Sequence, residues 1–235
     1  MKYKAIIFDV GDTLLEHYPS TAQIYAERLK YLNLVTDDLL NVISASIARA
    51  SNGQIIKEQN GEARMSDEDF NIMLDKAALS CVKNLENEDY YLEKLRALPL
   101  IEQELRIIPG TVEVLRSLKE KGFRLGIVSN HRTWLPEYLR ECGLAEFFET
   151  IIVSDIVGAE KPDIRIMQIA LEKLGLDAAS CLYVGDHPFD VLCARSAGMD
   201  CAWIAPADAV LPDSVPYGET YRIKKLGGLL PVLDA

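Results

Sequence analysis

Four short stretches of the chain carry side chains that could do chemistry at a strand end. Asp9 directly follows the apolar run 5–8 and precedes Gly11, which is typical of a buried strand that ends in a turn. An aspartate at such a place can act as a nucleophile, as a metal ligand, or as both; the alternative is an aspartate that only caps the turn. The other three stretches are Ser129-Asn130, Lys161-Pro162 and Asp186 to Asp190.

Together these residue types meet the needs of phosphoryl transfer. Asp9 can attack phosphorus and form an aspartyl-phosphate. Asp9 and Asp186 can hold Mg²⁺ through carboxylate oxygens, and the metal would offset the repulsion between the nucleophile and an anionic substrate. Ser129 and Lys161 can hold the non-bridging phosphoryl oxygens. Asp190, four residues after Asp186, can support a metal-bound water or hold Lys161.

The elements that must position these residues alternate between strand and helix from about Pro109 onward. Expected helices cover 111–121, 133–142, 162–174 and 189–197, and expected strands cover 5–8, 124–129, 150–153, 181–184, 201–204 and 221–223. This alternation, with glycine at helix ends, predicts an α/β protein with a three-layer, Rossmann-like core around a parallel sheet. The carboxyl ends of parallel strands share one edge, so the four stretches should meet there.

The segment 17–105 has a different pattern and is predicted to be an inserted, all-helical domain. Ser20 to Gln23 is typical of a capping box, and further helices are expected around 39–47, from Ser66 onward, and around 91–95. The polar stretch Ser51 to Arg64 is predicted to be a loop. We therefore expect a core domain formed by residues 1–16 and 106–235, and a helical domain formed by residues 17–105.

Composition limits the possible partners. The chain has 235 residues and a net charge of −11, which argues against nucleic acid but permits a small phosphorylated metabolite. No stretch is long and apolar enough for a membrane span, and no signal peptide is expected. The five cysteines form no Cys-x-x-Cys pair, so neither a zinc site nor a disulfide framework is expected. These features predict a cytoplasmic protein, either monomer or homodimer.

The motifs also resemble a known group of enzymes. Asp9 to Thr13, Ser129, Lys161 and Asp186 to Asp190 occur in the order of the four motifs of the haloacid dehalogenase superfamily. Most members of that superfamily are Mg²⁺-dependent phosphatases. The helical insert resembles the cap domain of the phosphoglycolate-phosphatase-like branch.

The resemblance implies a role for each matching residue. Asp9 would be the nucleophile, and Lys161 and Asp12 are the other catalytic candidates. The implied metal ligands are Asp9, Gly11 through its backbone carbonyl, Asp186 and Asp190. The implied substrate-binding residues are Thr13, Ser129, Asn130 and Lys161.

The first motif departs from the family pattern at Gly11. Phosphatases of the family usually carry a second aspartate there, which protonates the leaving group and then activates water. Asp12 lies one residue too late, and the loss of a general acid–base typically costs about 10²–10⁴-fold in rate. Three hypotheses follow from this departure: Asp12 substitutes through a local backbone shift, a histidine such as His131 or a water does so, or the enzyme favours substrates with good leaving groups.

The sequence therefore predicts a Mg²⁺-dependent hydrolase of small phosphomonoesters. Three alternatives remain open at this point. A 2-haloacid dehalogenase would use the same nucleophile without a metal, although Asp186 argues against it. A phosphomutase would return the phosphate to its substrate, and a weakly active or non-catalytic binding protein would be consistent with Gly11.

Overall fold

The computed structural model describes residues 2–35, 39–59, 63, 65–99 and 101–234, and the chain divides into two compact units. The first unit comprises Met1–Glu16 and Arg106–Ala235, and the second comprises His17–Leu105. The chain therefore leaves the first unit once and returns to it once, so the second unit is an insertion.

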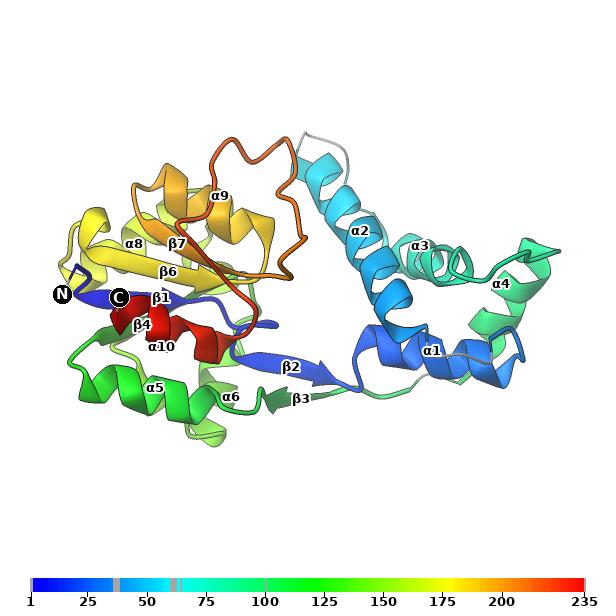
Figure 1. Cartoon of the computed structure of the whole chain (residues 1–235), viewed down its shortest axis with the longest axis horizontal. Coiled ribbons are helices and arrows are strands. Elements are labelled where there is room, and N and C mark those ends of the chain that lie inside the picture. The colour runs from blue at the N-terminus through cyan, green and yellow to red at the C-terminus, as the bar shows by residue number, and fades with distance from the viewer. Residues whose placement is uncertain (1, 36–38, 60–62, 64, 100, 235) are drawn as a thin grey trace. The chain divides into compact units, whose positions relative to one another are not determined.

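The first unit is built on a six-stranded sheet in which every neighbouring pair is parallel (Figure 1). The strands lie in the order β5-β4-β1-β6-β7-β8. Their bounds are Ala5–Phe8 (β1), Arg124–Ser129 (β4), Thr150–Val153 (β5), Cys181–Gly185 (β6), Asp200–Ile204 (β7) and Tyr221–Ile223 (β8). The predicted parallel sheet is confirmed, and β1, the strand before Asp9, lies between β4 and β6.

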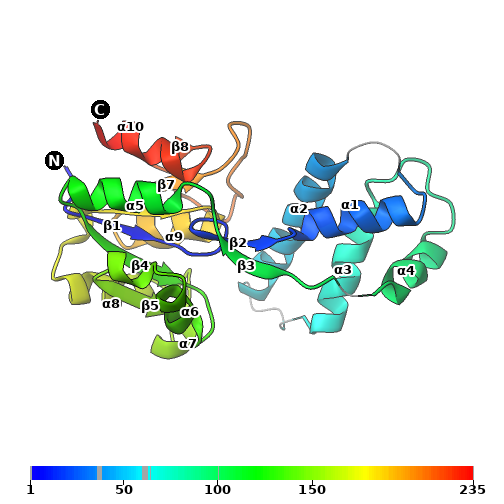
Figure 2. The same ribbon diagram turned by 90° about the horizontal axis from the view of Figure 1, so that it is seen from below.

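Helices cover both faces of this sheet and complete the three layers (Figures 1 and 2). Helices α8 and α9 pack on one face over a buried cluster that includes Ile7, Met167 and Cys201. Helices α5 and α10 lie on the other face. The helix bounds are Thr111–Glu120 (α5), Leu135–Glu141 (α6), Ser154–Val157 (α7), Arg165–Leu174 (α8), Pro188–Ser196 (α9) and Leu229–Asp234 (α10), with 3-10 turns at Ala145–Phe147, Ala178–Ser180 and Leu226–Gly228. The predicted fold class is confirmed.

A separate two-stranded sheet was not predicted from the sequence. It pairs β2 (Leu15–Tyr18) with β3 (Glu104–Ile107), the segments by which the chain leaves the first unit and comes back to it. Glu16 and Arg106 form an ion pair of 2.8 Å across these segments. Both strands are only four residues long and carry polar, partly exposed side chains, so their composition resembles that of loops.

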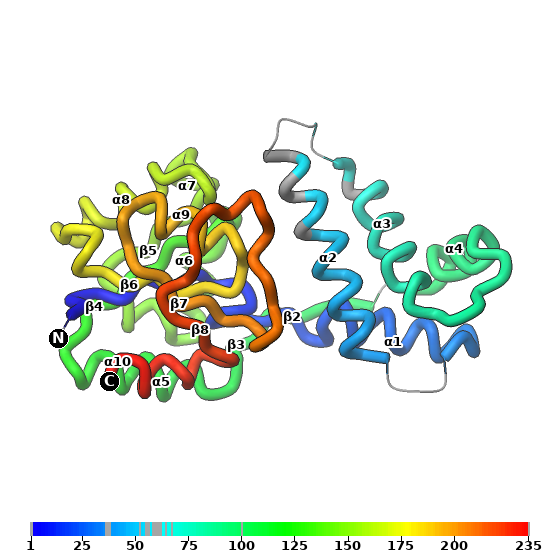
Figure 3. Tube along the Cα trace, turned by 45° about the horizontal axis from the view of Figure 1, so that its top comes forward, coloured from blue at the N-terminus to red at the C-terminus, as the bar shows by residue number. Residues whose placement is uncertain are grey.

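The second unit contains four helices in its described residues (Figure 3). They are α1 (Thr21–Tyr31), α2 (Leu40–Gln59), α3 (Asp67–Leu79) and α4 (Glu88–Ala97). The predicted capping box is present, because the Ser20 hydroxyl accepts the N–H of Gln23 and the Gln23 side chain accepts the N–H of Ser20. A shared core that includes Leu29, Ile43 and Leu95 holds the helices together.

The prediction of a loop over Ser51 to Arg64 is wrong for residues 51–59. Helix α2 continues to Gln59, while residues 60–62 and 64 lie outside the described residues. The segment 54–59 contains glutamine, lysine and glutamate, which are good helix formers, and a single glycine at position 53 costs a helix only about 1 kcal/mol. Polarity alone therefore gave a misleading indication of a loop.

Candidate active site

Asp9 lies directly after β1, at the carboxyl edge of the parallel sheet. Its backbone N–H donates to the Val184 carbonyl of β6 at 2.9 Å, so the strand pairing continues through this residue and fixes its position. Its side chain is only 12% exposed. Burial raises the pKa of the Asp9 carboxyl, attraction by Lys161 opposes this, and repulsion from Asp190 adds to it, so the net direction is upward.

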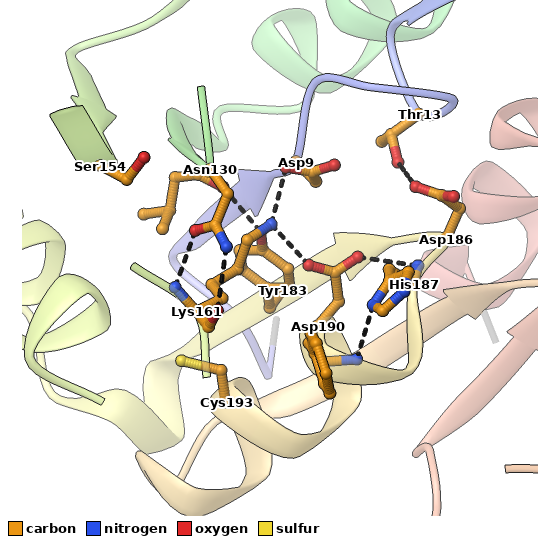
Figure 4. A network of polar contacts seen from close by, with 12 residues as sticks. Asp9, Thr13, Asn130, Ser154, Lys161, Tyr183, Asp186, His187, Asp190 and Cys193 are labelled. Carbon is orange, nitrogen blue, oxygen red and sulfur yellow. Dashed lines mark hydrogen bonds and ion pairs between the residues drawn. The ribbon is translucent and has the colours of Figure 1, made fainter. Parts of the chain in front are cut away.

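The Lys161 ammonium is enclosed by three acceptors (Figure 4). Nζ donates to Asp9 Oδ1 at 2.7 Å, to Asp190 Oδ1 at 2.6 Å and to Tyr183 Oη at 3.0 Å. Burial lowers the pKa of Lys161, but attraction by Asp190 and Asp9 outweighs it and the pKa is raised. Lys161 therefore stays charged and holds the Asp9 carboxylate in one orientation.

Asn130 holds the backbone of Lys161. Its amide Nδ2 donates to the Lys161 carbonyl at 2.9 Å, and its Oδ1 accepts the Lys161 N–H at 2.7 Å. These two hydrogen bonds resemble those between neighbouring strands, and they fix the loop that carries Lys161. Both ends of the amide of Asn130, a candidate for substrate binding from the resemblance, are thus directed at Lys161.

Tyr183 is a site residue that the motifs did not predict. It is fully buried in β6, and its hydroxyl donates to the Val128 carbonyl at 2.7 Å while it accepts from Lys161. A buried tyrosine hydroxyl usually has a hydrogen-bond partner. A tyrosine within an otherwise apolar strand, two residues before Gly185, was the available signal.

Asp190 lies on the first turn of α9 and is completely buried. One carboxylate oxygen accepts from Lys161, and the other accepts the backbone N–H of His187 at 2.9 Å. A Cβ at position 185 would overlap the Asp190 carboxylate, which explains the glycine there. Of the two roles considered for Asp190, the structure shows the contact with Lys161.

Asp186 follows β6 and faces the same edge as Asp9. The Thr13 hydroxyl donates to Asp186 Oδ1 at 3.1 Å, and Trp203 Nε1 donates to the Asp186 carbonyl at 2.7 Å. Burial, together with repulsion from Asp190 and Asp9, raises the pKa of Asp186 well above its usual range. The cluster therefore concentrates negative charge, which a bound cation would relieve.

The loop between Asp9 and Thr13 contains the departure from the family pattern. Gly11 is exposed, and a Cβ built on it meets no atom within 4 Å. Asp12 is also exposed and has a left-handed backbone with a φ of 48°. Aspartate tolerates this conformation better than most residues do.

Ser129 is the last residue of β4 and is 2% exposed. Phe8 pairs with Ile127, so Ser129 lies one residue further toward the carboxyl edge than Asp9 does.

The acidic residues suit a hard cation. Carboxylate oxygens of Asp9, Asp186 and Asp190 lie within 4.8 Å of one another. Both Asp190 oxygens already accept protein hydrogen bonds, so Asp9 and Asp186 are the pair best suited to a metal. Oxygen ligands are those that Mg²⁺ prefers.

Among helices formed by described residues, none is long and apolar enough to cross a membrane.

The site combines a candidate aspartate nucleophile, a lysine and a second carboxylate at the carboxyl edge of a parallel sheet. The comparison with protein families agrees with this arrangement. The chain belongs to the haloacid dehalogenase-like hydrolase family, whose model matches residues 3–198. This confirms the resemblance noted in the motifs and shows that the protein is a hydrolase of that family.

Individual relatives extend the comparison. Glyceraldehyde 3-phosphate phosphatase of Methanothermobacter thermautotrophicus is 33% identical over 98% of this chain and 95% of the relative. Pyrophosphatase PpaX of Bacillus pumilus is 34% identical, but the match covers 53% of this chain and 58% of that protein. Haloacid dehalogenase-like hydrolase domain-containing protein 3 of Mus musculus is 32% identical, over 55% of this chain and 52% of its own length.

Solved structures agree on the fold. The HAD phosphatase of Thermococcus onnurineus is 24% identical with a TM-score of 0.56, covering 98% of this chain and 97% of that one. The HAD-hydrolase YfnB of Bacillus subtilis, solved with bound magnesium, is 23% identical with a TM-score of 0.64 and full coverage of both chains. At these identities the likeness supports the fold and carries no residue roles.

Proposed function

We propose that this hydrolase is a Mg²⁺-dependent phosphatase that releases phosphate from a small phosphorylated metabolite, a phosphomonoester, through an aspartyl-phosphate on Asp9. The observation that supports this most directly is the ion pair between Lys161 and Asp9 beside the Asp186 carboxylate. Relatives named for phosphate release, from glyceraldehyde 3-phosphate and from pyrophosphate, support the same reaction class.

In this proposal the site residues of the first unit have distinct roles. Asp9 attacks phosphorus, and Lys161 orients its carboxylate and favours the charged form. The Ser129 hydroxyl donates a hydrogen bond to a non-bridging oxygen of the phosphoryl group. Thr13 orients Asp186 through their hydrogen bond.

Asp9 and Asp186 would hold the metal ion, with the backbone carbonyl of Gly11 as a further oxygen ligand. When bound, Mg²⁺ supplies positive charge that offsets the repulsion between a carboxylate nucleophile and an anionic substrate. Asp190 contributes through Lys161, because both of its oxygens are already occupied.

We also propose that the two units act as a catalytic core and a cap. A helical cap would exclude water and bulky substrates from the strand ends during the reaction. This role agrees with a small metabolite as the substrate and assigns substrate choice to the second unit, residues 17–105.

The test is a phosphate-release screen over phosphorylated metabolites with purified protein. We expect turnover with Mg²⁺, loss of turnover with EDTA, and recovery when Mg²⁺ is restored. Asp9→Asn should abolish both turnover and covalent phosphorylation of the protein. Halide release from 2-haloacids that persists in EDTA would replace the proposal with a dehalogenase, and turnover by Asp9→Asn would refute the assigned nucleophile.

A further inference from the structure

We propose that the site suits phosphate compounds whose leaving group departs without receiving a proton: monoesters of acidic phenols or enols within the proposed substrate class, and beyond it acyl phosphates and phosphoric anhydrides. The inference rests on the proposed function, because it concerns the step in which Asp9 takes the phosphoryl group. It is carried by the lack of a side chain at Gly11 and by the hydrogen bonds that already engage the protons of Lys161, Tyr183 and Thr13 (Figure 4).

Lys161 is the first group that could protonate a leaving oxygen, and its protons are committed. An ammonium has three protons. All three point at protein acceptors, which are Asp9, Asp190 and Tyr183. Transfer of one proton would also leave two carboxylates beside a neutral amine in a site where the lysine side chain is 5% exposed.

The remaining acidic protons of the network are directed into the protein. The Tyr183 hydroxyl donates to the Val128 carbonyl at 2.7 Å. The Cys193 thiol donates to the Asp163 carbonyl at 3.5 Å. Neither group is therefore aimed at a phosphoryl group on Asp9.

Nearer the loop, the Thr13 hydroxyl also donates to an acceptor within the protein, Asp186 Oδ1, at 3.1 Å. Gly11 provides no side chain. The protons of Lys161, Tyr183, Cys193 and Thr13 are thus directed at acceptors within the protein and not toward a leaving group on the substrate.

The chemistry then proceeds in two balanced steps. An Asp9 oxygen forms a bond to phosphorus while the bond from phosphorus to the leaving oxygen breaks, and the leaving group departs with that electron pair as an anion. Water then attacks phosphorus, the Asp9–phosphorus bond breaks, one water proton remains on the released phosphate, and the other neutralises the leaving group through solvent.

The cost of this departure depends on the acidity of the leaving group. Carboxylic acids have pKa values of about 4, whereas alkanols lie near water, whose pKa is about 15.7. A transition state that expels an unprotonated anion responds steeply to this difference. A transition state that transfers a proton at the same time responds weakly.

The experiment measures this response directly. The rate constant kcat/KM is determined with Mg²⁺ for a series of substituted phenyl phosphates, and for acetyl phosphate against ethyl phosphate, which are similar in size. Its logarithm is plotted against the pKa of the leaving group. The matched variant is Gly11→Asp, which the structure admits because a Cβ there meets no atom within 4 Å and Gly11 is not among the glycines with positive φ.

We expect a steep negative slope for the wild-type protein and a shallower one for Gly11→Asp. The added carboxyl should raise turnover of ethyl phosphate by about 10²–10⁴-fold, the usual range for a general acid–base, and should change acetyl phosphate much less. Asp12→Asn should leave the wild-type slope unchanged.

Three results would overturn the inference. These are a shallow slope in the wild-type protein, turnover of ethyl phosphate or glyceraldehyde 3-phosphate that equals that of acetyl phosphate, or a slope that steepens in Asp12→Asn, which would identify Asp12 as the proton donor. Failure of the proposed function is distinguishable, because it would remove Asp9-dependent phosphate release from every substrate, acetyl phosphate included.

Discussion

Tyr183→Phe tests whether the acceptors around Lys161 position the nucleophile. The substitution keeps the buried ring and removes only the hydroxyl, which accepts from Lys161 at 3.0 Å and donates to the Val128 carbonyl at 2.7 Å. A buried bond to a charged group contributes about 1.5–3 kcal/mol and a neutral one about 0.5–1.5 kcal/mol, so the loss should be about 2–4.5 kcal/mol. For a chain of this size that corresponds to a fall in Tm of about 4–18 °C.

The same substitution should slow the chemical step. With one acceptor gone, Lys161 can shift relative to Asp9, and a misplacement of about 1 Å at a reacting group can cost about 10²-fold in rate. We expect kcat and the rate of phosphorylation of Asp9 to fall by about 10- to 100-fold, with little change in KM. Rapid-quench measurement of the phosphorylated protein separates this step from later ones.

Tyr25→Phe is the matched control. Tyr25 is also buried, and its hydroxyl donates to Asp75 at 2.8 Å within the second unit. It should therefore lower the thermal stability without slowing phosphorylation of Asp9. The reasoning is refuted if Tyr183→Phe loses stability as Tyr25→Phe does and keeps the wild-type rate of phosphorylation.

Two further predictions concern stability. Burial raises the pKa of Asp200, but hydrogen bonds, including those from Lys2 and Tyr3, outweigh it and bring the pKa from 3.8 to about 2. Asp200 should therefore contribute about 2 kcal/mol above pH 4 that is lost as the pH falls from about 4 to 2, and urea unfolding of Asp200→Asn should lack this acid-dependent loss. Asp190→Asn removes one of two carboxylates from the buried Lys161 and should cost about 3–5 kcal/mol in the same assay; an unchanged midpoint would contradict the ion pair.

The arrangement of the sheet was predictable because each strand carries its own apolar pattern. Runs such as 5–8 and 124–129 are fully or almost fully buried, and the chirality and order of parallel crossovers bring their ends to one edge. Asp9, Lys161 and Asp186 follow from this logic, since each comes directly after a strand or a strand and its loop.

The partners of individual side chains were not predictable in the same way. Asn130 and Lys161 are 31 residues apart, and whether an amide faces a substrate or a neighbouring backbone depends on a loop path that no local pattern encodes. Tyr183 matches the pattern of an ordinary strand residue, because its hydroxyl acquires a role only when β4 and the Lys161 loop pack against it.

The central place of β1 in the sheet also has a consequence for synthesis of the chain. Ala5 pairs with Arg124 on one side and with Cys181 on the other, so β1 finds its partners only after the whole helical insert has been made. The insert, built from helices adjacent in sequence, can collapse early. Until β4 and β6 emerge, the nascent protein therefore exposes an apolar segment, 5–8, whose burial depends on the synthesis of residues 124–185.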